Sequence, residues 1–197
     1  MDIKDVAIVV LAAGNARRFG ADKLMADLDG MPLGLHAAAQ LAQLGAAAHF
    51  ALCQPSAAIA PHFLQLGFTI VENRHVEKGL SGSLHLAVAA AAQTKAQALL
   101  ITLADMPCVA LAHVAALIAA CDGEILASSD GIQSMPPAIF PRDSWPHLLE
   151  TEGDAGARPI LSNVSTLTAP LGSLRDIDTP DDLTASKARP LGIDPAS

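Results

Sequence analysis

Two segments that lie far apart in the chain combine residue types suited to holding a phosphate chain and a metal ion. In the first, Gly14 ends an apolar run and three cations follow it closely: Arg17, Arg18 and Lys23. A glycine after a buried strand lets backbone N–H groups approach a ligand, and nearby cations favour a phosphate chain. The alternative is an ordinary strand end followed by solvated basic residues. The segment contains neither a Walker A motif nor G-x-G-x-x-G.

The second segment carries a carboxylate. Asp105 and Pro107 come directly after the apolar run at residues 97–104. In α/β proteins ligands bind beyond the carboxyl ends of parallel strands, and Mg²⁺ is usually held by one or two carboxylates together with substrate phosphates. The sequence therefore predicts a magnesium ligand at Asp105. The alternative is that Asp105 only caps the turn before Pro107.

Strands that alternate with helices must position these residues. Buried strands are predicted at residues 6–13 and 97–104, and further strands at 48–53, 68–72 and 124–128. Helices are predicted at residues 32–44, 56–66 and 109–120, and an alanine-rich helix follows a small-residue loop at 79–83. Near the end, a strand from Leu174 runs into a helix opened by Thr179 and Pro180. This alternation is typical of parallel βαβ units in an α/β protein.

Composition limits the class of protein. The 197 residues suit one domain, expected at 1–187, with a flexible tail at 188–197. A net charge of −8 argues against partners such as nucleic acid or a membrane surface. Three widely spaced cysteines fit neither a disulfide framework nor a zinc site. We expect a reduced, cytoplasmic protein without a membrane span.

The motifs resemble those of the nucleotidyltransferases related to molybdenum cofactor cytidylyltransferase, which are themselves related to the molybdenum cofactor guanylyltransferases. Residues 11–14, 18–20 and Lys23 resemble the signature L-A-A-G-x-S-x-R-M-G-x-x-K, with Ala16 in place of the serine. Residues 103–107 resemble the L-x-D-M-P metal motif. The resemblance covers Val6 to Leu183. It implies a Rossmann-like three-layer sandwich with a mostly parallel sheet, of the nucleotide-diphospho-sugar transferase type.

A third segment bears on the nucleotide. In the small-residue loop, Ser81 or Ser83 can cap the following helix, or the open N–H groups can face a base or a phosphate. Residues 79–84 resemble the family segment G-[ML]-S-S-S-L, which favours the second role, and Asn73 falls near the family's base-binding residue. The nucleotide-binding residues implied by the resemblance are Leu11, Ala12, Ala13, Gly14, Lys23, Asn73, Gly79, Ser81 and Ser83.

Later segments bear on the acceptor and the metal. Pro137 matches the proline of the family's acceptor segment, although Met135 and Pro136 replace its G-H. Arg158 ends a G-D-x-G-A-R segment and is predicted to reach an acceptor phosphate. In the segment D-I-D-T-P, Asp176 is predicted to complete the metal site with Asp105, and Asp178 is interpreted as structural.

The resemblance implies a Mg²⁺-dependent transfer of a nucleoside monophosphate from a nucleoside triphosphate to a molybdopterin-type acceptor, with release of pyrophosphate. Catalysis is assigned to Arg18, Lys23 and Asp105: the two cations stabilise the transition state and the leaving pyrophosphate, and Asp105 holds Mg²⁺ between phosphates. The sequence L-A-A-G at residues 11–14, rather than L-A-G-G, favours CTP. Two alternatives stay open: a sugar-phosphate nucleotidyltransferase, and a non-catalytic carrier that hands nucleotide or pterin to a molybdoenzyme. A molybdoenzyme or its chaperone is the expected protein partner.

Overall fold

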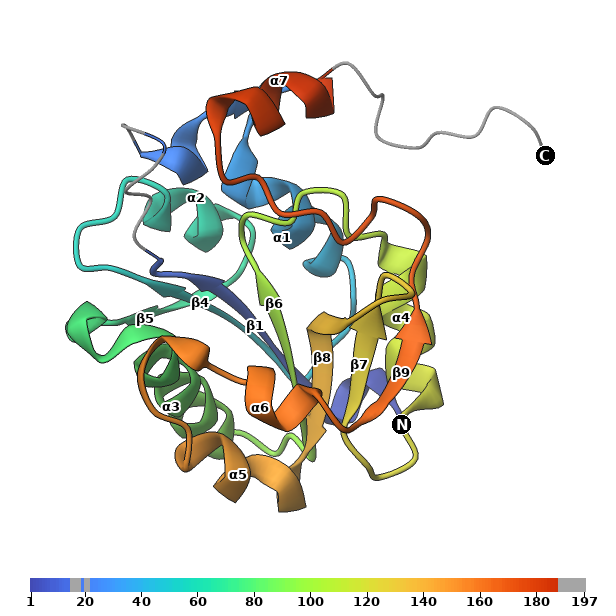
Figure 1. Ribbon diagram of the computed structural model, residues 1–197. Coiled ribbons are helices and arrows are strands. Elements are labelled where there is room, and N and C mark those ends of the chain that lie inside the picture. The colour runs from blue at the N-terminus through green and yellow to red at the C-terminus, as the bar shows by residue number, and fades with distance from the viewer. Residues whose placement is uncertain (15–18, 20–21, 188–197) are drawn as a thin grey trace.

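A seven-stranded sheet forms the centre of the described part of the chain (Figure 1). The computed structural model describes residues 1–14, 19 and 22–187, so Arg18 and the tail predicted at 188–197 lie outside the described residues. The strand order is β5-β4-β1-β6-β8-β7-β9. The strands are β1 (Val6–Ala12), β4 (Ala48–Cys53), β5 (Thr69–Glu72), β6 (Ala98–Leu103), β7 (Leu126–Ser129), β8 (Ser134–Pro141) and β9 (Ser165–Thr168).

Six of these seven strands point the same way. The parallel pairs are β1 with β4 and β6, β4 with β5, and β7 with β9. Strand β8 runs antiparallel to both β6 and β7. The carboxyl ends of β1, β4, β5 and β6 therefore meet at one edge, and the residues predicted to bind phosphate and metal follow directly after β1 and β6.

Helices cover both faces of the sheet, which explains why β1 is buried along its whole length. Val6, Ile8 and Val10 pack in one core with residues of α1 (His36–Leu41), α2 (Ala60–Gln65) and α4 (Leu111–Ala120). The alternate residues of β1 pack in a second core with α3 (Gly79–Ala92), α5 (Trp145–Leu149) and α6 (Arg158–Leu161), which lie together in Figure 1. The predicted three-layer α/β sandwich is confirmed. None of the described helices is long and apolar enough to cross a membrane.

A small third core closes the carboxyl edge of the sheet. The hairpin of β2 (Asp27–Leu28) and β3 (Met31–Pro32) and the last described helix, α7 (Pro180–Lys187), lie above that edge in Figure 1. Leu28, Leu33 and Ile177 are buried together, with Phe19 and Leu183 packed against them. The Ile177 N–H also donates to the Asp105 carbonyl at 2.9 Å. Segment 174–178 is thereby fixed beside the end of β6.

Two predicted elements were wrong. Residues 79–83 are not a loop but the first turns of α3, where small side chains let the helix lie against η6 (Gly153–Ala155). The predicted strand from Leu174 is absent from the described structure. Leu174 and Ile177 are buried at a spacing of three residues rather than two. The Ile177 N–H donates to the carbonyl of Asp105, which lies in a turn and not in a strand.

The strand predicted at 48–53 has the bounds of β4, and most of the other predicted elements occur with shifted bounds. The helix predicted at 32–44 is a 3₁₀ turn, η3 (Leu33–Leu35), followed by α1. The helix predicted at 56–66 begins only at Ala60, and Pro61 lies in its first turn, where a missing N–H costs no helical hydrogen bond.

Candidate nucleotide and metal site

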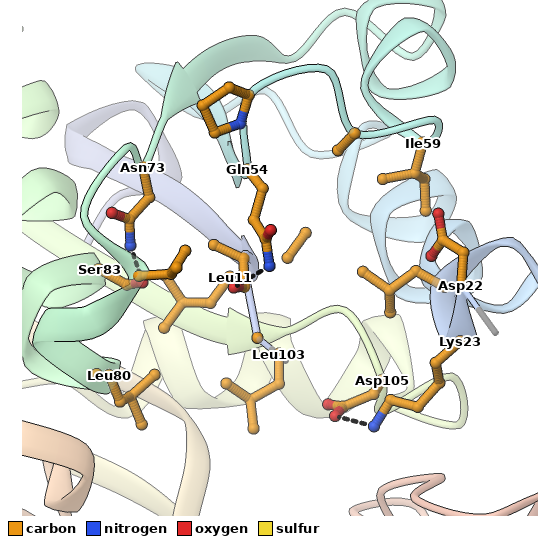
Figure 2. Close-up of a pocket in the computed structure, with 18 of the residues that line it drawn as sticks. Leu11, Asp22, Lys23, Gln54, Ile59, Asn73, Leu80, Ser83, Leu103 and Asp105 are labelled. Atoms are coloured by element: carbon orange, nitrogen blue, oxygen red, sulfur yellow. Dashed lines mark hydrogen bonds and ion pairs between the residues drawn. The ribbon is translucent and has the colours of Figure 1, made fainter. Parts of the chain in front are cut away.

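A cleft of about 1110 Å³ opens at the carboxyl edge of the sheet. Its lining combines the end of β1, the start of α3, Leu103 and Asp105 at the end of β6, and the loop at 54–59 that follows β4. A cleft at this position in a parallel sheet is the usual ligand site of α/β proteins. Figure 2 shows Asn73 and Ser83 at one side of the cleft and Lys23 and Asp105 at the other.

Among the described residues, none fills the space beside the backbone of the glycine after β1. Gly14 is exposed and lines the cleft. A Cβ added at Gly14 would meet no described atom within 4 Å. Next to it, the Gln54 Nε2 donates to the Ala13 carbonyl at 3.2 Å, which ties the 54–59 loop to the end of β1 (Figure 2). The arrangement leaves room for a ligand to approach the backbone at Gly14.

A buried amide marks the opposite side of the cleft. Asn73 is only 2% exposed. Its Nδ2 donates to Ser83 Oγ at 3.1 Å, its Oδ1 accepts from the His75 N–H at 2.9 Å, and its own N–H donates to the Cys53 carbonyl at 2.8 Å. These bonds fix Asn73 and Ser83 in one orientation, so this wall is preorganised for a ligand with polar edges.

The start of α3 is packed tightly against η6. Gly79 has φ +67°, and a Cβ there would collide with the Asp154 carboxylate and come within 2.8 Å of the Gly153 carbonyl. Only glycine satisfies both the backbone conformation and the close approach. Gly79, Leu80 and Ser83 consequently line the cleft from the N-terminal end of α3, which carries a partial positive charge.

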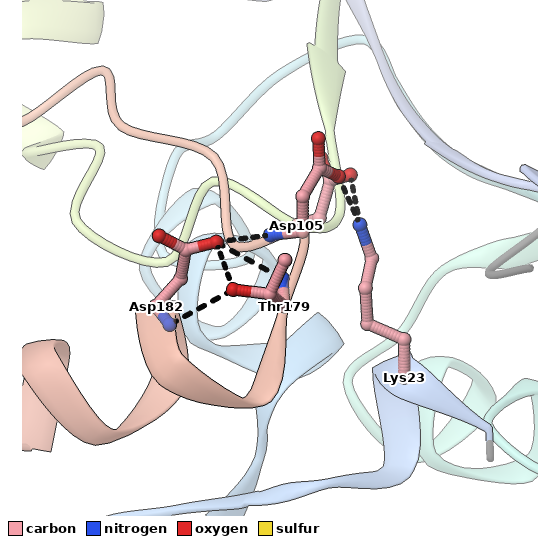
Figure 3. Close-up of polar contacts among 5 residues, drawn as sticks. Lys23, Asp105, Thr179 and Asp182 are labelled. Carbon is pink, nitrogen blue, oxygen red and sulfur yellow. Dashed lines mark hydrogen bonds and ion pairs between the residues drawn. The ribbon is translucent and has the colours of Figure 1, made fainter. Parts of the chain in front are cut away.

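A lysine between two carboxylates forms the charged side of the cleft. Lys23 Nζ lies 2.8 Å from Asp105 Oδ2 and 3.0 Å from Asp178 Oδ1 (Figure 3). The Lys23 side chain is 10% exposed. Burial by itself lowers the pKa of Lys23, but the charges and hydrogen bonds of Asp105 and Asp178 outweigh that effect, so its pKa is raised. The ammonium is therefore charged at neutral pH.

The donor set on this side fits a hard divalent cation. Asp105 Oδ1 is buried and has no hydrogen-bond partner among the described residues, and an unpaired buried carboxylate oxygen is costly unless a cation or donor completes it. Asp178 adds a second carboxylate to the cleft lining. Mg²⁺ and Mn²⁺ prefer such oxygen ligands, with phosphates filling the remaining positions.

The segment before α7 holds Asp178 in place. Asp182 Oδ2 accepts from the Asp178 N–H at 3.3 Å, the Thr179 N–H at 3.0 Å and Thr179 Oγ1 at 2.7 Å (Figure 3). In return, Thr179 Oγ1 accepts from the Asp182 N–H at 3.2 Å, which makes a capping box. Arg175 pairs with Asp182 at 2.7 Å. The Thr179 and Arg175 contacts lower the pKa of Asp182 to about 2.

The structure brings most of the predicted nucleotide residues to this cleft. Those that line it are Leu11, Ala12, Ala13, Gly14, Lys23, Asn73, Gly79, Ser83 and Asp105. Arg18, the remaining predicted catalytic residue, lies outside the described residues.

Four predicted residues lie away from the cleft lining. Ser81 is buried in α3, and its hydroxyl donates to the Lys78 carbonyl at 3.0 Å. Pro137 is buried in β8, where its carbonyl accepts from Ser128 Oγ at 2.6 Å. Arg158 is exposed at the start of α6. Asp176 does not line the cleft, although burial, followed by the charges of Asp178 and Asp105, raises its pKa.

Sequence reasoning missed residues that the fold adds to the cleft. Asp178 was interpreted as structural, yet it lines the cleft and pairs with Lys23. The D-I-D-T-P segment offers two carboxylates, and only the packed fold shows that Asp178 rather than Asp176 lines the cleft. Gln54, Glu77 and Asp154 also line the cleft. Asp154 belongs to the G-D-x-G-A-R segment, whereas no local motif singles out Gln54 or Glu77.

Comparisons with known proteins bear on the family and the fold of this chain. The family model described as MobA-like NTP transferase domain matches residues 8–168. The chain is 30% identical over 199 residues to the purine catabolism protein PucB of Bacillus subtilis (strain 168). The alignment covers 88% of this chain and 92% of that protein.

Solved structures share the fold. Rv0371c from Mycobacterium tuberculosis H37Rv matches with a TM-score of 0.78 and 23% identity, over 96% of this chain and 100% of that chain. A nucleotidyl transferase from Methanothermobacter matches with a TM-score of 0.78 and 21% identity, over 93% of this chain and 96% of that chain. A second structure of Rv0371c, a complex with manganese, matches with a TM-score of 0.72 and 22% identity, over 93% of this chain and 98% of that chain. The fold is thus the nucleotide-diphospho-sugar transferase type that the sequence predicted.

Proposed function

The chain belongs to the family of MobA-like NTP transferase domains, and from that premise we propose that it transfers CMP from CTP to a molybdopterin-type acceptor and releases pyrophosphate. The observation that carries the proposal is the meeting of Gly14, Lys23 and Asp105 in one cleft from two segments that lie far apart in the chain. The Lys23–Asp105 ion pair at 2.8 Å joins residues that are 82 positions apart.

The reaction requires alignment and charge stabilisation rather than a protein nucleophile. A phosphate oxygen of the acceptor attacks the α-phosphorus of CTP, and the bond from that phosphorus to the oxygen bridging the β-phosphate breaks. We assign the backbone at Ala13 and Gly14 to the triphosphate. Lys23, with Arg18 from outside the described residues, stabilises the negative charge on the leaving pyrophosphate.

Asp105 and Asp178 are the residues that would hold a divalent cation, Mg²⁺ by our proposal, and Asp178 replaces Asp176 in the predicted pair. When bound, the cation would offset negative charge on the phosphate oxygens. The manganese complex of Rv0371c supports a divalent metal in this fold. Asp105 Oδ1, which has no partner among the described residues, supports placing the cation on this side of the cleft.

The base and the acceptor occupy the remaining walls. We place the cytosine beside Asn73 and Ser83, whose amide and hydroxyl are fixed by their mutual hydrogen bond. The L-A-A-G sequence at residues 11–14 supports CTP over GTP. The acceptor would enter along Leu80, which lies across the cleft from Lys23 in Figure 2. We propose that the product passes to a molybdoenzyme or its chaperone in the reducing cytoplasm, consistent with three free cysteines.

The test is pyrophosphate release from CTP, GTP, ATP or UTP, each with Mg²⁺, in the presence of molybdopterin or of a sugar phosphate. Release with CTP that depends on molybdopterin would support the proposal. Release that depends on the sugar phosphate would establish the sugar-phosphate alternative. Tight CTP binding by calorimetry without pyrophosphate from any acceptor would identify a carrier, and equal binding of all four nucleotides would contradict the CTP assignment.

A further inference from the structure

Lys23 already occupies the space between the two carboxylates assigned to the metal. Its ammonium contacts Asp105 Oδ2 and Asp178 Oδ1 at 2.8 and 3.0 Å. A divalent cation bound to the same two carboxylates would lie within a few ångströms of this ammonium, and like charges at that separation repel strongly away from bulk water. Lys23 and the cation therefore compete for one carboxylate pair.

We infer that Lys23 is the resident counter-ion of the Asp105–Asp178 pair and makes metal binding depend on the nucleotide. In this account the carboxylates accept the cation fully only when a triphosphate takes over the Lys23 ammonium. The inference rests on the proposed function, because it requires a nucleoside triphosphate and a divalent cation to bind in this cleft. It adds a role for Lys23 before any bond is made or broken.

The local structure allows the ammonium to change partners while the backbone stays in place. Lys23 begins η2 (Lys23–Met25), where its carbonyl accepts from the Ala26 N–H at 3.1 Å. Beyond this fixed backbone, the side chain has a flexible four-carbon stem and a point charge without a preferred direction. Lys23 and Gly14 line the same cleft, so a triphosphate at Gly14 offers oxygens to the same ammonium.

The charges explain why the carboxylates should exchange Lys23 for the cation once the triphosphate is bound. Without nucleotide, Lys23 neutralises half of the charge on the Asp105–Asp178 pair. A triphosphate adds several negative charges, which compensate both the ammonium and the incoming cation. Metal and nucleotide should then bind with positive coupling, and the coupling must be equal in both directions.

The test compares Mn²⁺ affinity, measured by the electron paramagnetic resonance of free Mn²⁺, in wild type and Lys23→Met, without acceptor. Without CTP, wild type should bind Mn²⁺ weakly. After the Mn²⁺ that CTP binds in a protein-free sample is subtracted, CTP should tighten Mn²⁺ binding to the protein about tenfold or more, within the usual range of coupling. Lys23→Met should bind Mn²⁺ without CTP about tenfold more tightly than wild type. Lys95→Met, which removes the same charge from an exposed site before β6, should match wild type.

Two further measurements guard against an effect of misfolding. Lys23→Met leaves two carboxylates side by side, so its Tm should fall, and Mn²⁺ should raise that Tm more than it raises the Tm of wild type. Lys23→Arg keeps the positive charge and should retain the weak, CTP-dependent Mn²⁺ binding. If Lys23→Met does not fold, Lys23→Gln provides the same comparison.

Equal Mn²⁺ affinity of Lys23→Met and wild type without CTP would overturn the inference, as would wild-type affinity that CTP does not change. In either case Mn²⁺-dependent pyrophosphate release by wild type would leave the proposed function standing. Absence of Mn²⁺ binding by wild type even with CTP would remove both the inference and the metal-dependent function.

Discussion

The charges in the cleft set the requirements for its ligand. Five of the described residues that line it carry carboxylates, and one, Lys23, carries an ammonium; the acidic residues are Asp22, Glu77, Asp105, Asp154 and Asp178. A triphosphate would enter such a cleft at a large electrostatic cost unless a cation accompanies it. The need for a cation is clearest at Asp105, because its Oδ1 is buried and has no partner among the described residues.

A substitution at Asp105 separates its chemical role from its structural one. Asp105→Asn keeps the shape of the side chain but removes the charge that would attract the cation, so pyrophosphate release should fall by at least about a hundredfold. Asp143→Asn, an exposed change in the 3₁₀ helix η5 (Arg142–Ser144) after β8, should leave the rate unchanged. Retained turnover in Asp105→Asn, with circular dichroism showing a native fold, would remove Asp105 from the metal site.

Two elements hold the walls of the cleft, α3 through its glycine start and α7 through its capping box. At α3, Gly79 combines a positive φ with contact against Asp154 and Gly153. At α7, Asp182 accepts hydrogen bonds from Asp178 and Thr179 and so fixes the carboxylate that faces Lys23. Local backbone geometry thus positions side chains that reach the ligand.

Gly79→Ala should destabilise the protein. The backbone conformation alone costs an ordinary residue about 1–3 kcal/mol, and the added Cβ must also displace η6. Urea unfolding measures the loss, and CTP affinity should fall in parallel because the α3 wall moves. Gly45→Ala is the matched control, since a Cβ there meets nothing within 4 Å and φ is not positive. Equal stability of the two variants would contradict the tight packing of α3 against η6.

Asp182→Ala should weaken the metal site without direct contact with it. Loss of the capping box frees the Asp178 backbone, so Mn²⁺ affinity in the presence of CTP should fall about tenfold, the usual effect of removing a group that orients a ligand. Asp181→Ala, on the same turn of α7 and exposed, should have no such effect. Unchanged Mn²⁺ affinity in Asp182→Ala would show that Asp178 needs no such support.

Across the whole molecule, the sequence predicted the sheet more completely than the site. The continuous apolar run of β1 appears where the pattern placed it, because burial on both faces leaves a local signature. Strand β4 also has its predicted bounds. The pairing of Lys23 with Asp178 joins residues 155 positions apart, and no local pattern records such a contact. The same limit explains the strand wrongly predicted at Leu174, since only the packed fold shows that this segment has no ladder partner.

The stability of the whole domain should fall as the pH drops below neutrality. Burial lowers the pKa of His113 and of His49 below the ordinary value of 6.5. The unfolded chain therefore binds protons that the folded protein does not, and the free energy of unfolding should decrease from about pH 7 to pH 5.5. Urea titrations at these pH values measure the slope.

His113 lies 2.8 Å from Ser128 through Nε2, so His113→Gln can keep a hydrogen bond there while removing the titrating group. This variant should show a shallower loss of stability on acidification than wild type. An unchanged slope would mean that His113 does not contribute to it.

The most direct measurement for the proposed function is the position of cation and nucleotide in crystals grown with Mn²⁺ and CTP. The account predicts an anomalous Mn²⁺ peak coordinated by Asp105 and by phosphate oxygens, with the triphosphate against Gly14 and the Lys23 ammonium on a phosphate. A Mn²⁺ peak away from Asp105, or CTP bound outside this cleft, would contradict it.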